Sequence, residues 1–178
     1  SACVRDTTAQ PVADYLFVRL RGAVAAVQSA TTRMTAEAVA QGAQVTVMNN
    51  AEAVQDWRAS GEQTLQFFDA PSPDACLWRL SVPQTAPVLE LPYPTYLEWQ
   101  GAQRWMWAPA SAALALRELA QSVGGHATLF RASAAHAEVD KAVGVNTPLD
   151  VVQQRIQRQL QQQFDPKGVF ATGRMHPL

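Results

Sequence analysis

The stretch Tyr96-Leu97-Glu98-Trp99-Gln100-Gly101-Ala102-Gln103-Arg104-Trp105-Met106-Trp107 decides the fold class. Two short segments with aromatic side chains, 96–99 and 104–107, flank a four-residue connection in which Gly101 stands where a hairpin favours glycine. A connection this short joins antiparallel strands, because parallel neighbours need a crossover of a dozen residues or more. The stretch therefore predicts an antiparallel hairpin.

Further elements are predicted on both sides of this hairpin. Alternating character predicts strands at Cys76–Val82, where Arg79 stands between Trp78 and Leu80, and at His126–Ala132. Four prolines in Pro83–Pro94 exclude a helix and predict an extended connector. Ser111 is expected to cap a helix that closes at Gly124-Gly125. The expected inner face of that helix is Ala112, Leu116, Leu119 and Val123.

The first third of the chain has a strand, helix, strand, helix pattern. Its expected elements are a strand at Asp14–Leu20 with little exposed face, an amphipathic helix from Val24 to Gly42, a strand at Gln44–Met48, and a helix opened by Asn49 and Glu52 at capping-box spacing and ending near Gly61. A hinge is expected at Gln66–Pro73.

The last third is predicted to be a mobile loop followed by a helix. The loop is Ser133–Asn146, which is rich in alanine and has no clean period. Thr147-Pro148-Leu149-Asp150 predicts a helix start with Thr147 as the N-cap. A turn at Asp165-Pro166-Lys167-Gly168 ends the helix. Its expected buried stripe is Leu149, Val152, Ile156 and Leu160.

Strands in consecutive groups predict an α+β fold with a mainly antiparallel sheet and helices packed on one face. The other face carries Trp, Arg, His and Glu, so another domain or a ligand is expected to cover it. A length of 178 residues fits one domain or two small subdomains.

Charge and composition exclude several classes of partner. The 14 basic and 15 acidic residues nearly cancel, and no three basic residues are consecutive, so binding to nucleic acid or to a membrane surface is not expected. No apolar run approaches a membrane span, and no leader peptide is recognisable, so a soluble, cytoplasmic protein is expected. Cys3 and Cys76 lack a CxxC partner and are expected to be structural thiols.

Motifs for autonomous catalysis are missing from the sequence. No G-x-G-x-x-G or Walker loop is present to cradle phosphates, and neither G-x-S-x-G nor H-E-x-x-H occurs. Cofactor binding by this chain alone is therefore not expected.

Three segments carry a resemblance to a known family: Trp99–Trp105, Gly124–Arg131 and the terminal stretch Gln163–Arg174, which runs Phe-Asp-Pro-Lys-Gly-Val-Phe and then Gly-Arg. The terminal stretch resembles the C-terminus of FAD-linked oxidases of the vanillyl-alcohol oxidase type. The other two resemble the smaller, FAD-binding subunit of bacterial glycolate oxidases within that family. In the first half only the strand and helix layout is similar.

The resemblance implies that residues 1–178 form a cap domain, built of ferredoxin-like pieces, with a flavin-facing tail at 158–178. The domain that holds FAD in this family would lie outside the chain, as the opening on Ser1 rather than Met also suggests. The implied activity is oxidation of a small 2-hydroxy acid such as glycolate by hydride transfer to FAD, and the fragment alone is expected to be inactive. The implied partners are the FAD domain and an iron–sulfur subunit.

The resemblance also implies roles for individual residues. Arg104 is the candidate clamp for the substrate carboxylate, and Trp99 and Arg131 are further substrate-binding candidates. His126 is the candidate base that accepts the hydroxyl proton. The flavin-facing candidates are Gly173 and Arg174.

Both polar candidates also have structural interpretations, since arginine often stacks on tryptophan and a histidine at a strand end is often only hydrogen-bonded. No metal is predicted, because relatives with a metal carry two histidines on the comparable strand. Here His126 is present, but Ser133 stands seven residues on. The alternative function is a stand-alone α+β binding or dimerisation module that uses the aromatic face.

Overall fold

The computed structural model describes the backbone of residues 1–6 and 13–170. The chain divides into two compact units. One unit comprises Ser1 and Leu16–Asp69, and the other comprises Ala2–Tyr15 and Ala70–Leu178. The division at Asp69 falls inside the segment 66–73 that the sequence predicts to be a hinge.

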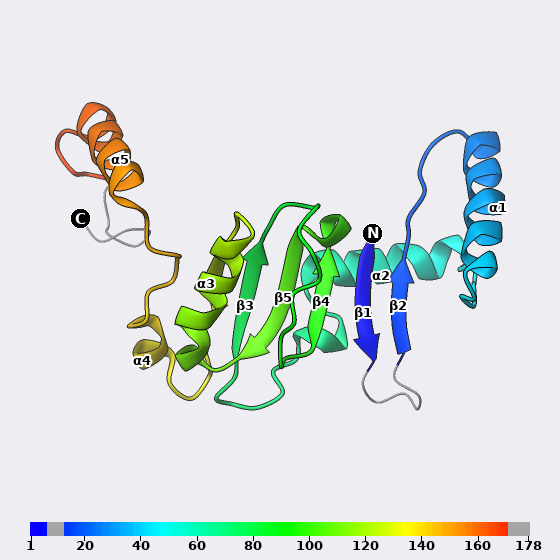
Figure 1. Cartoon of the computed structure of the whole chain (residues 1–178), viewed down its shortest axis with the longest axis horizontal. Helices are drawn as coiled ribbons and strands as arrows, with labels where there is room; N and C mark the ends of the chain where they lie inside the picture. Colours follow the sequence, from blue (N-terminus) through cyan, green and yellow to red (C-terminus); the bar gives the residue numbers. More distant parts are fainter. Residues whose placement is uncertain (7–12, 171–178) are drawn as a thin grey trace. The chain divides into compact units, whose positions relative to one another are not determined.

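Within the described residues, six strands form one sheet in the order β2-β1-β4-β5-β3-β6 (Figure 1). The strands are β1 (Ala2–Asp6), β2 (Ala13–Phe17), β3 (Cys76–Ser81), β4 (Thr95–Glu98), β5 (Gln103–Ala108) and β6 (His126–Arg131). The pairs β1–β4, β4–β5, β3–β5 and β3–β6 are all antiparallel. The predicted α+β class with an antiparallel sheet is confirmed.

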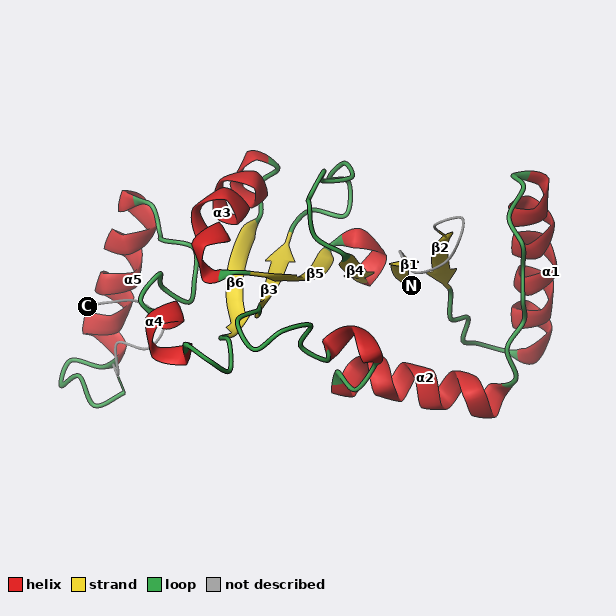
Figure 2. Ribbon diagram, turned by 90° about the horizontal axis from the view of Figure 1, so that it is seen from below, coloured by secondary structure: helices red, strands yellow, loops and turns green. Residues whose placement is uncertain are grey.

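The described helices are α1 (Val24–Ala40), α2 (Asn50–Glu62), α3 (Ala113–Ser122), α4 (Ala137–Lys141) and α5 (Val151–Phe164), with short 3-10 turns η1 (Gln66–Phe68), η2 (Trp99–Gly101) and η3 (Ala110–Ala112). Figure 2 colours these helices red and the strands yellow. None of the helices in the described part of the chain is both long and apolar enough to span a bilayer.

The predicted hairpin is confirmed, with β4 and β5 joined through η2. Trp99, Gln100 and Gly101 all have positive φ angles there, of 52°, 57° and 87°. A positive φ costs glycine little, which explains Gly101 at the end of the turn. The proline-rich segment 83–94 contains neither helix nor strand, as predicted.

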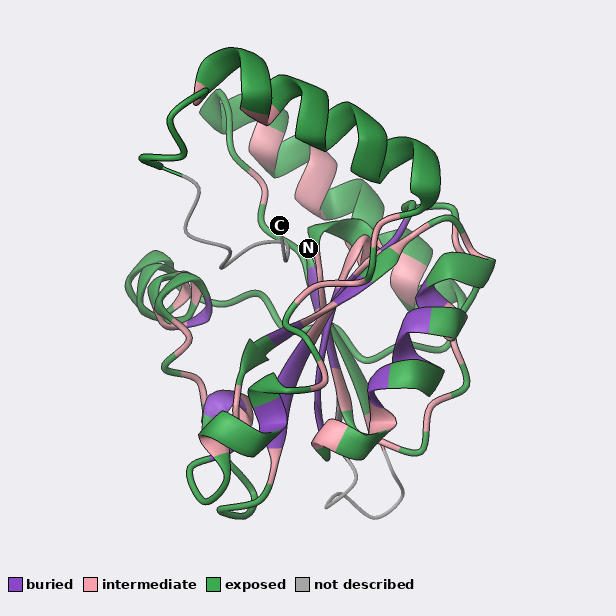
Figure 3. Ribbon diagram, turned by 90° about the vertical axis from the view of Figure 1, so that its left-hand side faces the viewer, coloured by how far each residue is buried: buried purple, intermediate pink, exposed green. Residues whose placement is uncertain are grey.

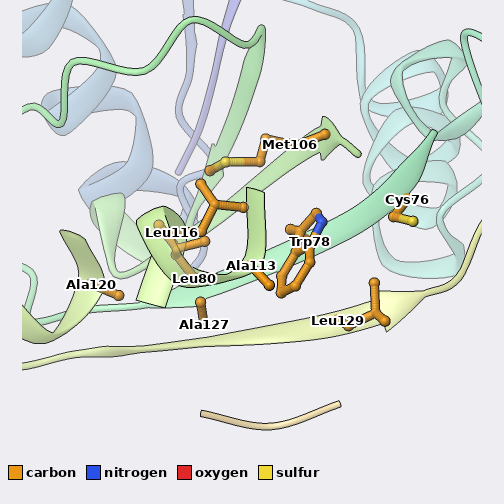
Figure 4. Close-up of a cluster of buried hydrophobic side chains, with 10 residues drawn as sticks. Cys76, Trp78, Leu80, Met106, Ala113, Leu116, Ala120, Ala127 and Leu129 are labelled. Carbon is orange, nitrogen blue, oxygen red and sulfur yellow. The ribbon is translucent and has the colours of Figure 1, made fainter. Parts of the chain in front are cut away.

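Helix α3 packs against one face of the sheet and forms the core, which Figure 4 shows in close-up. We call this side the α3 face. Its buried side chains are Cys76, Trp78, Leu80, Met106, Ala108, Ala113, Leu116, Ala120, Ala127 and Leu129. Each large apolar side chain buried there contributes roughly 1.5–3 kcal/mol to the free energy of folding. In Figure 3 the buried, purple segments follow the central strands and one side of α3.

The start of α3 differs from the prediction. Its N-cap is Ala112, without a side-chain hydrogen bond, because η3 leads directly into the helix and Ser111 lies within that turn. Leu116 is buried as predicted, together with Ala113, Arg117 and Ala120. The other predicted inner residues, Ala112, Leu119 and Val123, are only half-buried. The Arg117 guanidinium stacks 5.8 Å from the Trp78 ring and donates to the carbonyl oxygens of Val143 and Gly144.

Helix starts follow the sequence at α2 and differ at α5. The Asn49 side chain accepts a 3.0 Å hydrogen bond from the Glu52 backbone, as predicted. Helix α5 is capped by Asp150, which forms a reciprocal capping box with Gln153. Thr147 does not cap it, because its hydroxyl is used by β6, where it bonds the backbone N–H and the carbonyl oxygen of Ala127.

Two other local predictions are wrong. The segment 44–48 is not a strand, and the expected loop 133–146 contains α4 and a buried carboxylate, Asp140. Asp140 accepts a backbone hydrogen bond from Ser133, which gives the segment an internal anchor. The sequence did not predict this short helix, because the alanine-rich segment 133–146 shows no helical period of apolar residues.

Apolar sides of several elements stay exposed among the described residues. Neither α1 nor α5 has a buried residue. The predicted buried stripe on α5 is instead exposed at Val152, Ile156 and Leu160, and Tyr15 to Phe17 on β2 are exposed too. Periodicity defines the apolar side of a helix, but burial requires a neighbour that covers it.

Candidate functional site

The side of the sheet opposite α3 carries the aromatic and cationic residues, and we call it the second face. Side chains alternate between the two faces along a strand, so the cross-strand register assigns each residue to a side. On β3, β5 and β6 the second face comprises Leu77, Arg79, Ser81, Gln103, Trp105, Trp107, His126 and Thr128. Phe130 and Arg131 join them at the register shift between β3 and β6, where the Phe130 ring contacts Trp105 and Arg131 pairs with Leu77.

Arg79 lies on the second face beside a pair of contacting rings. Its guanidinium carbon is 6.0 Å from the centre of the Trp105 ring and 5.6 Å from that of Phe130. The two rings meet edge to face, with centroids 4.8 Å apart. Arg79 pairs with Trp105 on β5 and with Thr128 on β6. The rings therefore stabilise the cation and restrict its orientation.

Glu98, a carboxylate on the same face, accepts hydrogen bonds from two neutral donors. Glu98 Oε2 accepts hydrogen bonds from the indole Nε1 of Trp105 at 2.7 Å and from Gln103 Nε2 at 3.0 Å. Within the described residues no carboxylate forms an ion pair with Arg79, and its Nε is buried without a hydrogen-bond partner. Arg79 is thus a half-buried cation whose charge no described residue neutralises.

His126 lies on the second face close to Arg79. It is exposed at the start of β6 and pairs with Ser81, whereas Thr128 pairs with Arg79. Arg79 and His126 are therefore diagonal cross-strand neighbours, about 7–8 Å apart between Cα atoms. Arg131 stands at the opposite end of β6, about 16 Å along the strand from His126, with its guanidinium 6.0 Å from the Trp107 ring.

Arg104 projects from the α3 face, because it pairs with Leu80. Only 5% of its surface is exposed. Its Nε donates to the carbonyl oxygen of Gly101 at 2.9 Å, Nη1 to Pro87 at 2.9 Å and Nη2 to Ala86 at 3.2 Å. Burial lowers the pKa of Arg104 from its ordinary value. The guanidinium therefore ties the proline-rich connector to the hairpin.

The structure does not bring Trp99, Arg104 and His126 together at one site. Trp99 is 70% exposed in the turn between β4 and β5, and Arg104 and His126 lie on opposite faces of the sheet. The alternation of a strand explains the separation, since Arg104 is one residue away from the second-face residue Trp105. Gly173 and Arg174 lie outside the described residues.

A separate polar cluster joins β3 to the segment before α4. The carboxylate Asp140 Oδ2 accepts from the Ser133 backbone at 3.0 Å and from the Cys76 thiol at 3.4 Å. Hydrogen bonding from Ser133 lowers the pKa of Asp140. Burial, followed by the bond to Asp140, raises the pKa of Cys76 to about 11. A thiol that stays protonated at neutral pH is a poor nucleophile, so this cluster is structural.

A comparison with curated proteins identifies a relative. The chain is 35% identical over 161 residues to glycolate oxidase subunit GlcE of Escherichia coli (strain K12). The predicted resemblance is confirmed. The match covers 90% of this chain, and the chain spans 39% of the length of GlcE. It is therefore similar to a part of a FAD-linked oxidase subunit. No family model matches, and no solved structure matches.

Within this GlcE-like chain, Arg79 is the residue that the sequence did not single out as a site candidate. The sequence did contain an indication, because a charged residue in the middle of the apolar strand Cys76–Val82 is uncommon unless it is paired or functional. The pattern did not reveal what surrounds Arg79, namely two rings and, among the residues that the structure describes, no carboxylate paired with it. Among the described side chains, no three His, Cys, Asp or Glu residues are grouped as metal ligands would be.

Proposed function

We propose that this chain is the cap part of a flavin-dependent oxidoreductase subunit that oxidises a small 2-hydroxy acid, with glycolate as the expected substrate. The observation that carries the proposal is the 35% identity to glycolate oxidase subunit GlcE over 90% of the chain. Because the sequence has no loop to cradle phosphates, FAD would be held mainly by polypeptide outside these 178 residues.

The second face fits the needs of this chemistry. A 2-hydroxy acid requires a fixed positive charge for its carboxylate and a group that accepts its hydroxyl proton. Arg79 offers a cation that has no acidic partner in the described part of the chain, and His126 is an exposed cross-strand neighbour. Phe130, which is 44% exposed, offers a flat apolar surface on the same face. The chemistry that a bound flavin supplies is acceptance of the hydride.

The roles that we propose follow this arrangement. His126 accepts the hydroxyl proton at a ring nitrogen. Arg131 and Trp99 contact substrate or flavin. Gly173 and Arg174 face the flavin, as the resemblance implies. Arg104 has its donors bound to three backbone carbonyls, so we assign it to positioning the connector 83–94 rather than to holding the substrate.

The exposed apolar sides of α1 and α5 support a place in a larger protein. Val24 and Val39 on α1, and Ile156 and Leu160 on α5, expose a third or more of their surface. GlcE is much longer than this chain, and a FAD-holding domain of the same subunit is the occupant that we propose for these surfaces. Glycolate oxidase subunits associate with other subunits, and an iron–sulfur subunit is a further proposed partner.

Anaerobic reduction by glycolate tests the proposal. The full-length subunit that contains this chain should purify as a yellow protein, and glycolate should bleach the visible absorbance of its oxidised flavin. The variant His126→Asn should keep its flavin and bleach about 100-fold more slowly, since general base catalysis contributes roughly 10²–10⁴-fold. A colourless protein, or a yellow one that glycolate does not bleach, would contradict the proposal.

A second candidate function is a stand-alone dimerisation module, which the uncovered apolar sides of β2, α1 and α5 favour. It requires a tight dimer that forms without flavin. Sedimentation equilibrium on the colourless protein separates the two functions. A dimer with a micromolar or lower dissociation constant, which the variant Ile156→Glu no longer forms, would favour the dimerisation module.

A further inference from the structure

We propose that Arg79 binds the carboxylate of the substrate at the second face. This inference rests on the proposed function and deepens it by naming the residue that selects for a carboxylic acid. The first step is the charge. A half-buried guanidinium normally pairs with an acid, yet no described carboxylate pairs with Arg79, and its buried Nε makes no hydrogen bond.

The second step is orientation. Trp105 and Phe130 contact each other, and their ring centres lie 6.0 and 5.6 Å from the guanidinium carbon, so the ring pair restricts the cation from one side. The Trp105 ring is itself fixed, because its Nε1 donates to Glu98. An arginine held in this way presents a planar fork of N–H groups, which matches the two oxygens of a carboxylate. The aromatic contacts thus orient the Arg79 guanidinium for a ligand without neutralising its charge.

The third step is the group next to the charge. Thr128 lies opposite Arg79 across the strand pair, and Ser81 and His126 form the next cross-strand pair on the same face. Hydroxyl and imidazole groups within one residue pair of the cation can bind the 2-hydroxyl that a 2-hydroxy acid carries beside its carboxylate. A cation with a hydroxyl or imidazole group beside it fits a small hydroxy acid better than a simple anion, because a simple anion has no hydroxyl group for these side chains to bind.

Two other arginines on the neighbouring strands, Arg104 and Arg131, are less suited to this role. Arg104 lies on the opposite face and is committed to three carbonyl oxygens. Arg131 shares the second face but stands at the other end of β6, beside Trp107. Of these three, only Arg79 is a diagonal neighbour of His126. Carboxylate binding should therefore depend more strongly on Arg79 than on Arg131.

Calorimetry with oxalate in the full-length subunit tests this inference without requiring turnover. Oxalate is a dicarboxylate similar to glycolate that carries no hydrogen to transfer. We expect Arg79→Met to raise the Kd for oxalate by roughly 10- to 100-fold, the range for loss of a charge-assisted pair. Arg79→Lys, which keeps the charge but loses the fork, should show a smaller increase than Arg79→Met, and so should Arg131→Met. Arg58→Met on the exposed surface of α2 is the control and should stay within about threefold of the wild type.

Each outcome decides the inference. Oxalate binding that is unchanged in both Arg79 variants, or that depends on Arg131 alone, overturns it, and so does a wild-type subunit that does not bind oxalate. If Arg79→Met does not fold by circular dichroism, Arg79→Lys and Arg79→Gln provide the comparison. Binding that depends on Arg79, in a subunit whose flavin glycolate does not bleach, supports carboxylate recognition while rejecting the proposed function.

Discussion

The Nη1 group of Arg104 donates a 2.9 Å hydrogen bond to the carbonyl oxygen of Pro87, seventeen residues earlier in the chain. Segment 83–94 has neither helix nor strand, so its backbone carbonyls need partners from elsewhere. Together with the bonds to Gly101 and Ala86, this contact fixes the connector against the hairpin. Arg104, which the sequence suggested as the clamp for the substrate carboxylate, thus binds backbone carbonyl oxygens instead.

Replacing Arg104 should lower stability more than it affects substrate binding. We expect Arg104→Met to reduce the free energy of unfolding by about 2–4 kcal/mol, because it removes three part-buried, charge-assisted hydrogen bonds to the carbonyl oxygens of Gly101, Pro87 and Ala86. Urea denaturation measures the loss. Arg58→Met on the exposed surface of α2 is the matched control and should cost less than about 0.5 kcal/mol. Equal losses for the two variants would show that the connector does not depend on Arg104.

Gly125 lies where the chain enters β6 and leaves no room for a side chain. A Cβ at this position would approach the carbonyl oxygen of Ser81 and stand 2.7 Å from Cγ1 of Val82. We therefore expect Gly125→Ala to destabilise the protein by about 2 kcal/mol or more. Thermal unfolding followed by circular dichroism provides the measurement.

The control for Gly125→Ala is Gly61→Ala within α2. No atom lies within 4 Å of a Cβ built at Gly61. Alanine is the better helix former there and should raise the free energy of unfolding by up to about 1 kcal/mol. If both alanine variants shift the melting temperature in the same direction, the close approach at Gly125 has no energetic consequence.

Stability should depend on pH through Asp140. Hydrogen bonding from Ser133 lowers the pKa of this carboxyl from its ordinary value, so folding favours the ionised form. The stabilising contribution is therefore complete above the unfolded-state pKa, near 4, and is lost as the pH falls through the lower folded-state pKa. The difference in melting temperature between wild type and Asp140→Asn should be larger at about pH 7 than at about pH 3. A difference independent of pH would mean that Asp140 does not titrate with folding.

The two cysteines should react at different rates. Burial raises the pKa of the Cys76 thiol to about 11, so little thiolate is present at about pH 8. We expect iodoacetamide to label Cys76 only after unfolding in urea, whereas Cys3, which is half-buried, should react in the native protein. The variant Cys3→Ser isolates the Cys76 reaction for mass spectrometry. Rapid native labelling of Cys3→Ser would contradict the buried environment of Cys76.

Local features of the fold could be predicted because their causes are local. The hairpin follows from Gly101 between two aromatic segments, and α2 follows from Asn49 with Glu52 three residues on. These signals act over a few residues and do not depend on distant parts of the chain. The helix start at Thr147 failed for the opposite reason, since a distant partner on β6 claims its hydroxyl.

The sequence by itself determined the class of the fold, the identity of most strands and helices, and the resemblance to an oxidase subunit. Only the tertiary structure decided that β3 lies between β5 and β6, which places Arg79 beside His126 and turns Arg104 to the other face. Alternation along a strand shows which residues share a side, but not which side meets the helix or which strand lies next to it. Those choices depend on packing between segments far apart in the chain, where no local pattern acts.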